Sequence, residues 1–469
     1  MAIYFDWALK VGQVAPATTY TFGRPDSAND FTSRLLQASV KMSIGIGQLP
    51  TASASITLDN SDGAFTPFGG GTYEDFDWLA QVIWLYPKTG TNLASLTERA
   101  TLFSGIVADV RYEDDGFTST VTLECDDPFT IFHRNVLLAD RDIFLSPKYV
   151  NIELINIMFG GGTYTPNAPT FGKTNIAARP FSDAYLEEFL ASVYPHQQVE
   201  YSADEGTSVA DILADFAVAE HGIMLPAQVV GNLNGNTANT GVGFTWIARN
   251  RLSPWTQGGD QTPHIFEFVE TTPTGTQFPF RAPTVGFSID EITTTASCTI
   301  AGAGAVTQTA SNTTASGAYG ARSATFSSLM YGYDSQALTL AEHLVARYDS
   351  VEYGVTGLTI TGGMITSKCS DAALEKATAL VEGGMVWDEY TTLEDDVPHP
   401  GALYQKMEVS FTGAGGVDLS SNITFFHASY EITPTDWELT LSGGRPSVSS
   451  FGFIVGETNY GVLGTNKVA

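Results

Sequence analysis

Short stretches in which apolar and polar residues alternate recur along this chain, and each is ended by a cluster of turn-forming residues. Residues 54–58 (ASITL) alternate in this way and stop at residues 59–63 (DNSDG). A period of two places successive side chains on opposite faces of a β-sheet, and Asp, Asn, Ser and Gly favour tight turns. This pattern predicts a fold made mainly of β-strands joined by turns.

Two hairpins with the same order of features lie toward the two ends of the chain. Residues 102–125 contain a strand (LFSGIVADV), an acidic turn (EDDG) and a returning strand (STVTLEC), which predict a hairpin closing a small barrel. Residues 423–441 contain a strand (ITFFHASYEI), a turn (PTD) and a returning strand (WELTL). Because alternation is common in β proteins, a duplicated barrel and two unrelated hairpins both stay open.

The length of the chain, 469 residues, favours about three units over one small core. We predict an N-terminal β-barrel unit at residues 1–147, an inserted α/β unit at 148–350, and a second β-barrel with the C-terminal segment at 351–469. A low-complexity stretch at 293–316, rich in Thr, Ala, Ser and Gly, lacks large side chains. It is predicted to be weakly packed or to lie at an edge.

The pattern changes toward a helical period in the middle of the chain. Residues 207–217 (TSVADILADFA) predict the best helix, with Thr207 or Ser208 as its N-cap and Gly222 at its end. Apolar stripes at helical spacing also occur at residues 152–159, 185–190 and 335–348. The inserted unit is therefore predicted to combine helices with strands.

The charge of the chain argues against nucleic-acid binding. Acidic residues number 51 against 22 basic ones, which gives a formal net charge of −29. Such a surface repels phosphate backbones, so we expect no sequence-specific nucleic-acid binding, although an acidic lining would suit a conduit for DNA. The three cysteines, Cys125, Cys298 and Cys369, predict no disulfide framework. No apolar run reaches about 18 residues and no export signal is readable, so we expect no membrane span.

Four segments, in this order, resemble the hub or minor tail proteins of long-tailed bacteriophages and gene-transfer particles, a family related to the central hub of contractile baseplates. They are residues 55–67 (SITLDNSDGAFTP), the hairpin from 103–107 (FSGIV) to 121–127 (VTLECDD), residues 317–323 (GAYGARS) with the following helix, and residues 432–441 (ITPTDWELTL) with 453–456 (FIVG) and 461–464 (GVLG). Each is weak alone, but together they span nearly the whole chain. The sequence departs from the family after Tyr348, where a Pro-Arg pair is usual.

The resemblance implies a structural protein of the virion, at the distal end of the tail, assembled in the host cytoplasm. It implies a homotrimer whose two barrels per chain give six similar units, so that a threefold ring seats on a sixfold tail tube and closes or channels DNA exit. The implied partners are the distal tail protein or tail tube above, the tape measure protein in the lumen, and the central fibre or other tip proteins below.

Candidate chemical sites are few, and each has a plainer structural interpretation. Asp59, Asp62 and Gly63 could form a calcium loop, but the full ligand spacing is missing, which favours a plain turn. The seven histidines, at 133, 196, 221, 264, 343, 399 and 427, show no zinc spacing. We therefore assign no catalytic, cofactor-binding or metal-binding residue.

Two alternatives to a structural hub stay open. The acidic pairs Glu187-Glu188 and Asp388-Glu389 could be the carboxylates of a tail-associated cell-wall hydrolase. Tryptophans could stack on sugars in a carbohydrate receptor-binding module, although core packing accounts for most of them: Trp7, Trp78, Trp84, Trp246, Trp255, Trp387 and Trp437. A hydrolase should show a separable catalytic domain, and a receptor module is usually a terminal appendage.

Overall fold

The computed structural model describes most of the predicted strands. The described residues are 4–12, 29–67, 71–73, 78–79, 81–90, 96–98, 101–127, 136–137, 140–142, 148–149, 198–229, 241–247, 266–270, 272–286, 292–302, 304–349, 354–370, 373–374, 377, 380–381, 403, 407–412 and 418–446. Large antiparallel sheets dominate these residues, so the predicted mainly β fold is confirmed.

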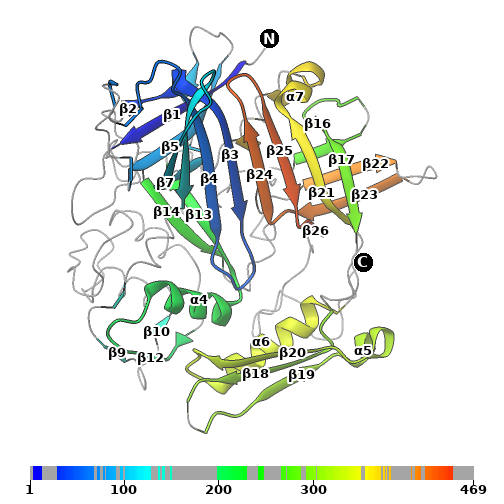
Figure 1. Ribbon diagram of the computed structural model, residues 1–469. Coiled ribbons are helices and arrows are strands. Elements are labelled where there is room, and N and C mark those ends of the chain that lie inside the picture. The colour runs from blue at the N-terminus through cyan, green and yellow to red at the C-terminus, as the bar shows by residue number, and fades with distance from the viewer. Residues whose placement is uncertain are drawn as a thin grey trace, which may run out of the picture.

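The largest element is an antiparallel sheet of twelve strands, in the order β17-β21-β25-β24-β3-β4-β8-β7-β5-β1-β2 with β6 paired to β5 (Figure 1). The strands are β1 (Tyr4–Gly12), β2 (Asn29–Asp30), β3 (Leu35–Ser43), β4 (Thr51–Asp59), β5 (Val82–Gly90), β6 (Thr97–Glu98), β7 (Phe103–Asp114), β8 (Ser119–Asp126), β17 (Arg281–Gly286), β21 (Gly354–Thr361), β24 (His427–Ile432) and β25 (Trp437–Ser442). A single turn of 3₁₀ helix, η1 (Thr32–Arg34), precedes β3.

The pairing of β3 with β24 joins the two ends of the chain in this sheet. Val40 lies opposite Tyr430, and Ala38 lies opposite Ile432. The strands predicted to form two separate small barrels are therefore neighbours, and among the described strands no closed barrel is found. Alternation predicted the hairpins, but it carries no information on which strand edges meet. The division at residues 147 and 350 stays a prediction.

A five-stranded sheet lies beside the β17 end of the twelve-stranded sheet (Figure 1). Its order is β16-β15-β22-β23-β26, from β15 (Phe266–Val269), β16 (Phe278–Pro279), β22 (Met407–Thr412), β23 (Asp418–Thr424) and β26 (Arg445–Pro446). Phe268, Phe278 and Val409 belong to the same buried cluster as Trp437 and Leu439. One hydrophobic core therefore connects the two sheets.

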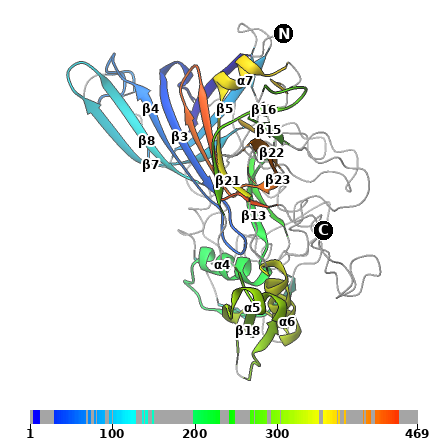
Figure 2. The same ribbon diagram turned by 90° about the vertical axis from the view of Figure 1, so that its right-hand side faces the viewer.

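A separate group of elements lies below the main sheet in both views (Figures 1 and 2). It contains a three-stranded sheet in the order β19-β18-β20, helix α6 and the short helix α5. Their bounds are β18 (Thr295–Ile300), β19 (Gln308–Ser311), β20 (Ser323–Leu329), α5 (Thr313–Tyr319) and α6 (Asp334–Arg347). Three two-stranded ladders pair β9 (Arg141–Asp142) with β12 (Ser202–Ala203), β10 (Lys148–Tyr149) with β11 (Gln198–Val199), and β13 (Ile223–Val229) with β14 (Gly241–Ile247).

The low-complexity stretch differs from its prediction. Strand β19 lies at an edge as expected, but β18 is the central strand, and Ala296 and Cys298 are fully buried. The large side chains that this stretch lacks come from α6, whose Leu340 and Leu344 belong to the same buried cluster. Small residues in β18 therefore allow the helix to pack closely against the sheet.

Both best-predicted helices are present, as α4 (Val209–Glu220) and α6. Ser208 holds the N-cap position of α4, but its side chain makes no capping hydrogen bond. The helix ends at His221, in the left-handed region with φ 48°, and not at Gly222. The predicted helical turns at 152–159 and 185–190 lie outside the described residues. No described helix has the length and apolarity needed to cross a membrane.

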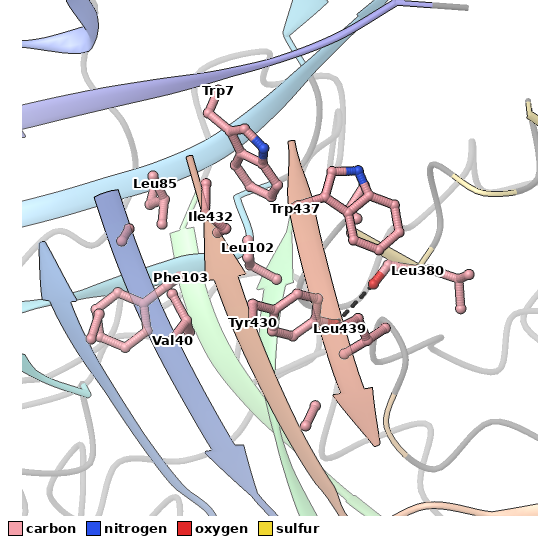
Figure 3. Packing of buried hydrophobic residues seen from close by; sticks show 14 of the residues in the cluster. Trp7, Val40, Leu85, Leu102, Phe103, Leu380, Tyr430, Ile432, Trp437 and Leu439 are labelled. Atoms are coloured by element: carbon pink, nitrogen blue, oxygen red, sulfur yellow. Dashed lines mark hydrogen bonds between the residues drawn. The ribbon is translucent and has the colours of Figure 1, made fainter. Parts of the chain in front are cut away.

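The core beneath β24 and β25 is built from large side chains (Figure 3). Trp437 is 2% exposed, and Tyr430 donates a hydrogen bond from its hydroxyl to the carbonyl oxygen of Leu380 at 2.8 Å. A Cβ added at Gly362, the first residue of α7 (Gly362–Lys368), would lie 2.7 Å from Nε1 of Trp437. The indole ring therefore packs against backbone that leaves no room for a larger residue.

We expect Trp437→Ala to lower the free energy of unfolding by about 3–5 kcal/mol, because it removes a buried indole and leaves a cavity. Glu438→Ala, one residue along β25 on the opposite face, should cost no more than about 1 kcal/mol, because it loses a surface ion pair with Arg281. Thermal and denaturant unfolding of the two variants measures this. Equal losses would contradict the assignment of Trp437 to the core.

Candidate assembly surface

Alternation gives the twelve-stranded sheet a continuous polar face on the side opposite its core. We define the polar face as the outward side chains of β21, β25, β24, β3, β4, β8 and β7. Ladder pairing aligns one residue from each strand in a row across this face: Thr361, Glu438, Glu431, Ser39, Ser55, Glu124 and Asp109. Four of these seven side chains are carboxylates, so the row is acidic.

At the centre of the row, β3 and β4 each contribute a serine that bonds a glutamate on the strand at its other side. Ser39 Oγ donates to Oε1 of Glu431 at 2.7 Å, and Ser55 Oγ donates to Oε1 of Glu124 at 3.2 Å. Ser39 and Ser55 are themselves ladder partners. The N-terminal and C-terminal strands therefore present matching serine–glutamate pairs to solvent.

The outer acids of the row are each paired with an arginine. Arg281 of β17 pairs with Glu438, and Arg111 of β7 lies 3.3 Å from Asp109 and 3.8 Å from Glu124. Ion pairs this exposed contribute at most about 1 kcal/mol each, so they orient the side chains more than they stabilise the fold. The row keeps an excess of negative charge after this pairing.

Threonine pairs on neighbouring strands also contribute to the polar face. Thr57 and Thr122 lie 3.4 Å apart through their Oγ1 atoms, as do Thr359 and Thr440. Short side chains lose little conformational entropy when a partner covers them, so such a face suits association with another protein.

One contact on the polar face pairs a hydroxyl with an imidazole. Ser43 Oγ lies 2.7 Å from Nδ1 of His427. A serine nucleophile needs a base that a third group orients, and no described carboxylate is hydrogen-bonded to His427. The pair also lies on an open sheet face. The geometry is that of a cross-strand contact between β3 and β24.

The turn after β4 has the plain turn geometry that the sequence favoured over a calcium loop. The amide of Ser61 donates to Oδ1 of Asp59 at 2.9 Å, and the amide of Phe65 donates to Oδ1 of the buried Asn60 at 2.7 Å. Gly63 has a φ of +67°, in the left-handed region that favours glycine. The polar side chains thus bond neighbouring backbone groups. No group of three or more potential metal ligands occurs among the described residues.

Arg34 holds the second carboxylate of this turn. Its guanidinium donates to both carboxylate oxygens of Asp62, at 2.9 and 2.7 Å, and lies 5.0 Å from the ring centroid of Phe65. The hydrogen bond from Arg34 lowers the pKa of Asp62 to about 2. Sequence alone could not identify this partner, because Arg34 precedes β3 and Asp62 follows β4.

Among the other residues singled out from the sequence, two histidines lie side by side. His221 and His343 have ring centroids 5.6 Å apart beside α4 and α6, remote in sequence from His427. Four tryptophans, Trp7, Trp78, Trp84 and Trp437, are buried, which excludes them from a sugar-stacking surface. The acidic pairs at 187–188 and 388–389, Trp255, Trp387 and the histidines at 133, 196, 264 and 399 lie outside the described residues, and only the backbone of Trp246 is described, in β14.

Comparison with known proteins yields similarity at the level of solved structures. No protein-family model matches the chain, and no curated protein matches it. The tail protein from Neisseria meningitidis MC58 aligns over 94% of this chain and 96% of its own, with 11% identity and a TM-score of 0.45. The 43 kDa tail protein of prophage MuSo2 from Shewanella oneidensis aligns over 94% and 98%, with 10% identity and a TM-score of 0.42.

A third similar structure is the prophage tail protein gp18 from Listeria monocytogenes, with 93% of this chain and 94% of its own covered, 10% identity and a TM-score of 0.37. All three are tail proteins, the class that the sequence motifs resemble.

We expect the carboxyl of Asp62 to titrate near pH 2 in the folded protein and to return toward its ordinary value near 3.9 in Arg34→Ala. Because the folded pKa is depressed, this contribution to stability is fully present above pH 3.9 and is lost as the pH falls through about 2. Side-chain carbon NMR of Asp62 measures both values. Lys41→Ala on the polar face is the matched control, and a pKa of Asp62 unchanged by Arg34→Ala would contradict the pairing.

Proposed function

We propose that this chain is a structural hub protein at the distal tip of a bacteriophage-type tail. One observation carries the proposal: three of the four sequence segments that resemble the family lie side by side in space. The turn after β4, the β7–β8 hairpin and the β24–β25 hairpin belong to one run of adjacent strands, in the order β25-β24-β3-β4-β8-β7. Segments from residue 55 to 441 thus contribute to one body.

This arrangement argues against the receptor-module alternative. A carbohydrate-binding appendage is usually a terminal unit with its own core, whereas the C-terminal hairpin here packs into the same core as the N-terminal strands. The four tryptophans whose side chains the structure describes are buried, so none of these four offers a face on which a sugar could stack. Function in such a molecule lies in its interfaces, and the polar face is the extended surface that we assign to contacts with neighbouring tail subunits.

The full assembly follows from the resemblance to hub proteins. Three copies form a ring around the tail axis, and the similar hairpins on each side of β3 and β4 supply six comparable units to a sixfold tube. The distal tail protein or tail tube lies above the ring, the tape measure protein lies in its lumen, and the central fibre or other tip proteins lie below. The net charge of −29 suits a ring through which DNA passes without sticking.

Trimer formation through the polar face can be tested with charge reversal. Glu431→Lys places a cation in the centre of the acidic row, and we expect it to lower the trimer fraction by at least about tenfold while the melting temperature stays close to that of the parent protein. Light scattering of purified protein, and averaged images of tail tips, measure assembly. Glu342→Lys, an exposed acid on α6, is the matched control. A threefold ring missing even from intact tail tips would contradict the proposal.

We further expect no cell-wall hydrolysis by this chain. Incubation of the purified protein with cell wall from the host should release no more soluble fragments than buffer does, because the described surface offers hydroxyls and carboxylates without an oriented nucleophile. Release of fragments that disappears when Glu187 or Asp388 is replaced by the amide would favour the hydrolase alternative instead.

A further inference from the structure

The β7–β8 hairpin extends past β5, its neighbour on one side (Figure 2). Strand β7 pairs with β5 only from Phe103 to Ile106, but continues along β8 as far as Asp114. Phe117, at the tip, is 96% exposed. Transfer of such an aromatic ring from water into an apolar pocket of a partner has a favourable free energy.

The turn that carries Phe117 is held firmly without any packing of the ring. The amides of Phe117 and Thr118 donate to Oδ1 of Asp115 at 2.8 and 2.7 Å. The amide of Gly116 donates to Oδ1 of Asp114 at 2.9 Å, and Gly116 has a φ of +83°. The hydrogen bonds from the amides of Thr118 and Phe117 lower the pKa of Asp115. A fixed turn reduces the entropy lost when the tip docks.

The charge around Phe117 restricts the kind of surface that can receive it. Glu113, Asp114 and Asp115 lie just before Phe117 in the sequence and place three carboxylates at the hairpin end. Anionic lipid and nucleic-acid phosphates repel such a tip. A second copy of this chain, with 22 basic residues against 51 acidic ones, offers few basic side chains to surround it. Complementarity therefore favours an apolar pocket whose rim carries Lys or Arg, on a protein other than this one.

We propose that the β7–β8 hairpin is a docking arm, and that Phe117 inserts into a basic-rimmed apolar pocket of a different tail protein. The ring supplies the buried anchor, and the acidic side chains steer and align it. This inference rests on the proposed function, because it requires a tail in which the partner is present. It adds a contact distinct from the polar face, since Phe117 lies at the end of the arm and not within the sheet.

Incorporation into purified tail particles tests the arm. We expect Phe117→Ala to reduce the amount of this chain per tail by at least about tenfold, with an unchanged melting temperature because the side chain is exposed in the free protein. Glu113→Lys should also reduce incorporation by reversing charge at the rim. The controls are Val306→Ala, which shortens a 57% exposed apolar side chain on the other side of the molecule, and Glu342→Lys.

Photo-crosslinking identifies what receives the ring. Benzoylphenylalanine in place of Phe117 should give an adduct with one other protein, at a peptide with Lys or Arg flanking apolar residues. An adduct with a second copy of this chain, no adduct in intact tails, or normal incorporation of Phe117→Ala would overturn the proposal. Absence of the parent chain from purified tails would instead contradict the proposed function, so the two failures are distinguishable.

Discussion

The ladder between β3 and β24 is the contact on which the rest of the molecule depends. It brings Ser39 within hydrogen-bonding distance of Glu431, 392 positions later in the chain, and it makes one sheet out of strands from both ends. The core beneath the sheet follows from this contact, since Val40 and Tyr430 point inward as opposite partners. The acidic row follows from it as well, because the intervening residues point outward in the same register.

Division of the sheet into an apolar and a polar side determines where function can reside. The inward side packs large aromatic residues into the core, including Trp7, Trp78 and Trp437. The outward side carries short hydroxyl side chains and ion pairs. These form a surface that suits contact with another protein. Phe117 is the most exposed of the large hydrophobic residues in the described part of the chain.

Local features of the fold were readable from the sequence, and long-range ones were not. Alternation predicted the hairpins of β7 with β8 and β24 with β25, and helical spacing predicted α4 and α6, because these patterns depend on neighbouring residues. The pairing of β3 with β24, and the Arg34–Asp62 ion pair, depend on the meeting of distant segments. The sequence predicted the acidic turn. It did not predict the exposure of Phe117, because that depends on the β7–β8 hairpin extending past β5.

The position of β24 also has a consequence for synthesis on the ribosome. Strand β3 leaves the ribosome hundreds of residues before its partner, so its edge stays unsatisfied until residues 427–432 emerge. Non-local pairing of this kind is slow and leaves strand edges open to wrong partners in the meantime. A truncated product that lacks β24 would leave the edge of β3 unpaired. Such an exposed edge would favour degradation of the product before it could assemble.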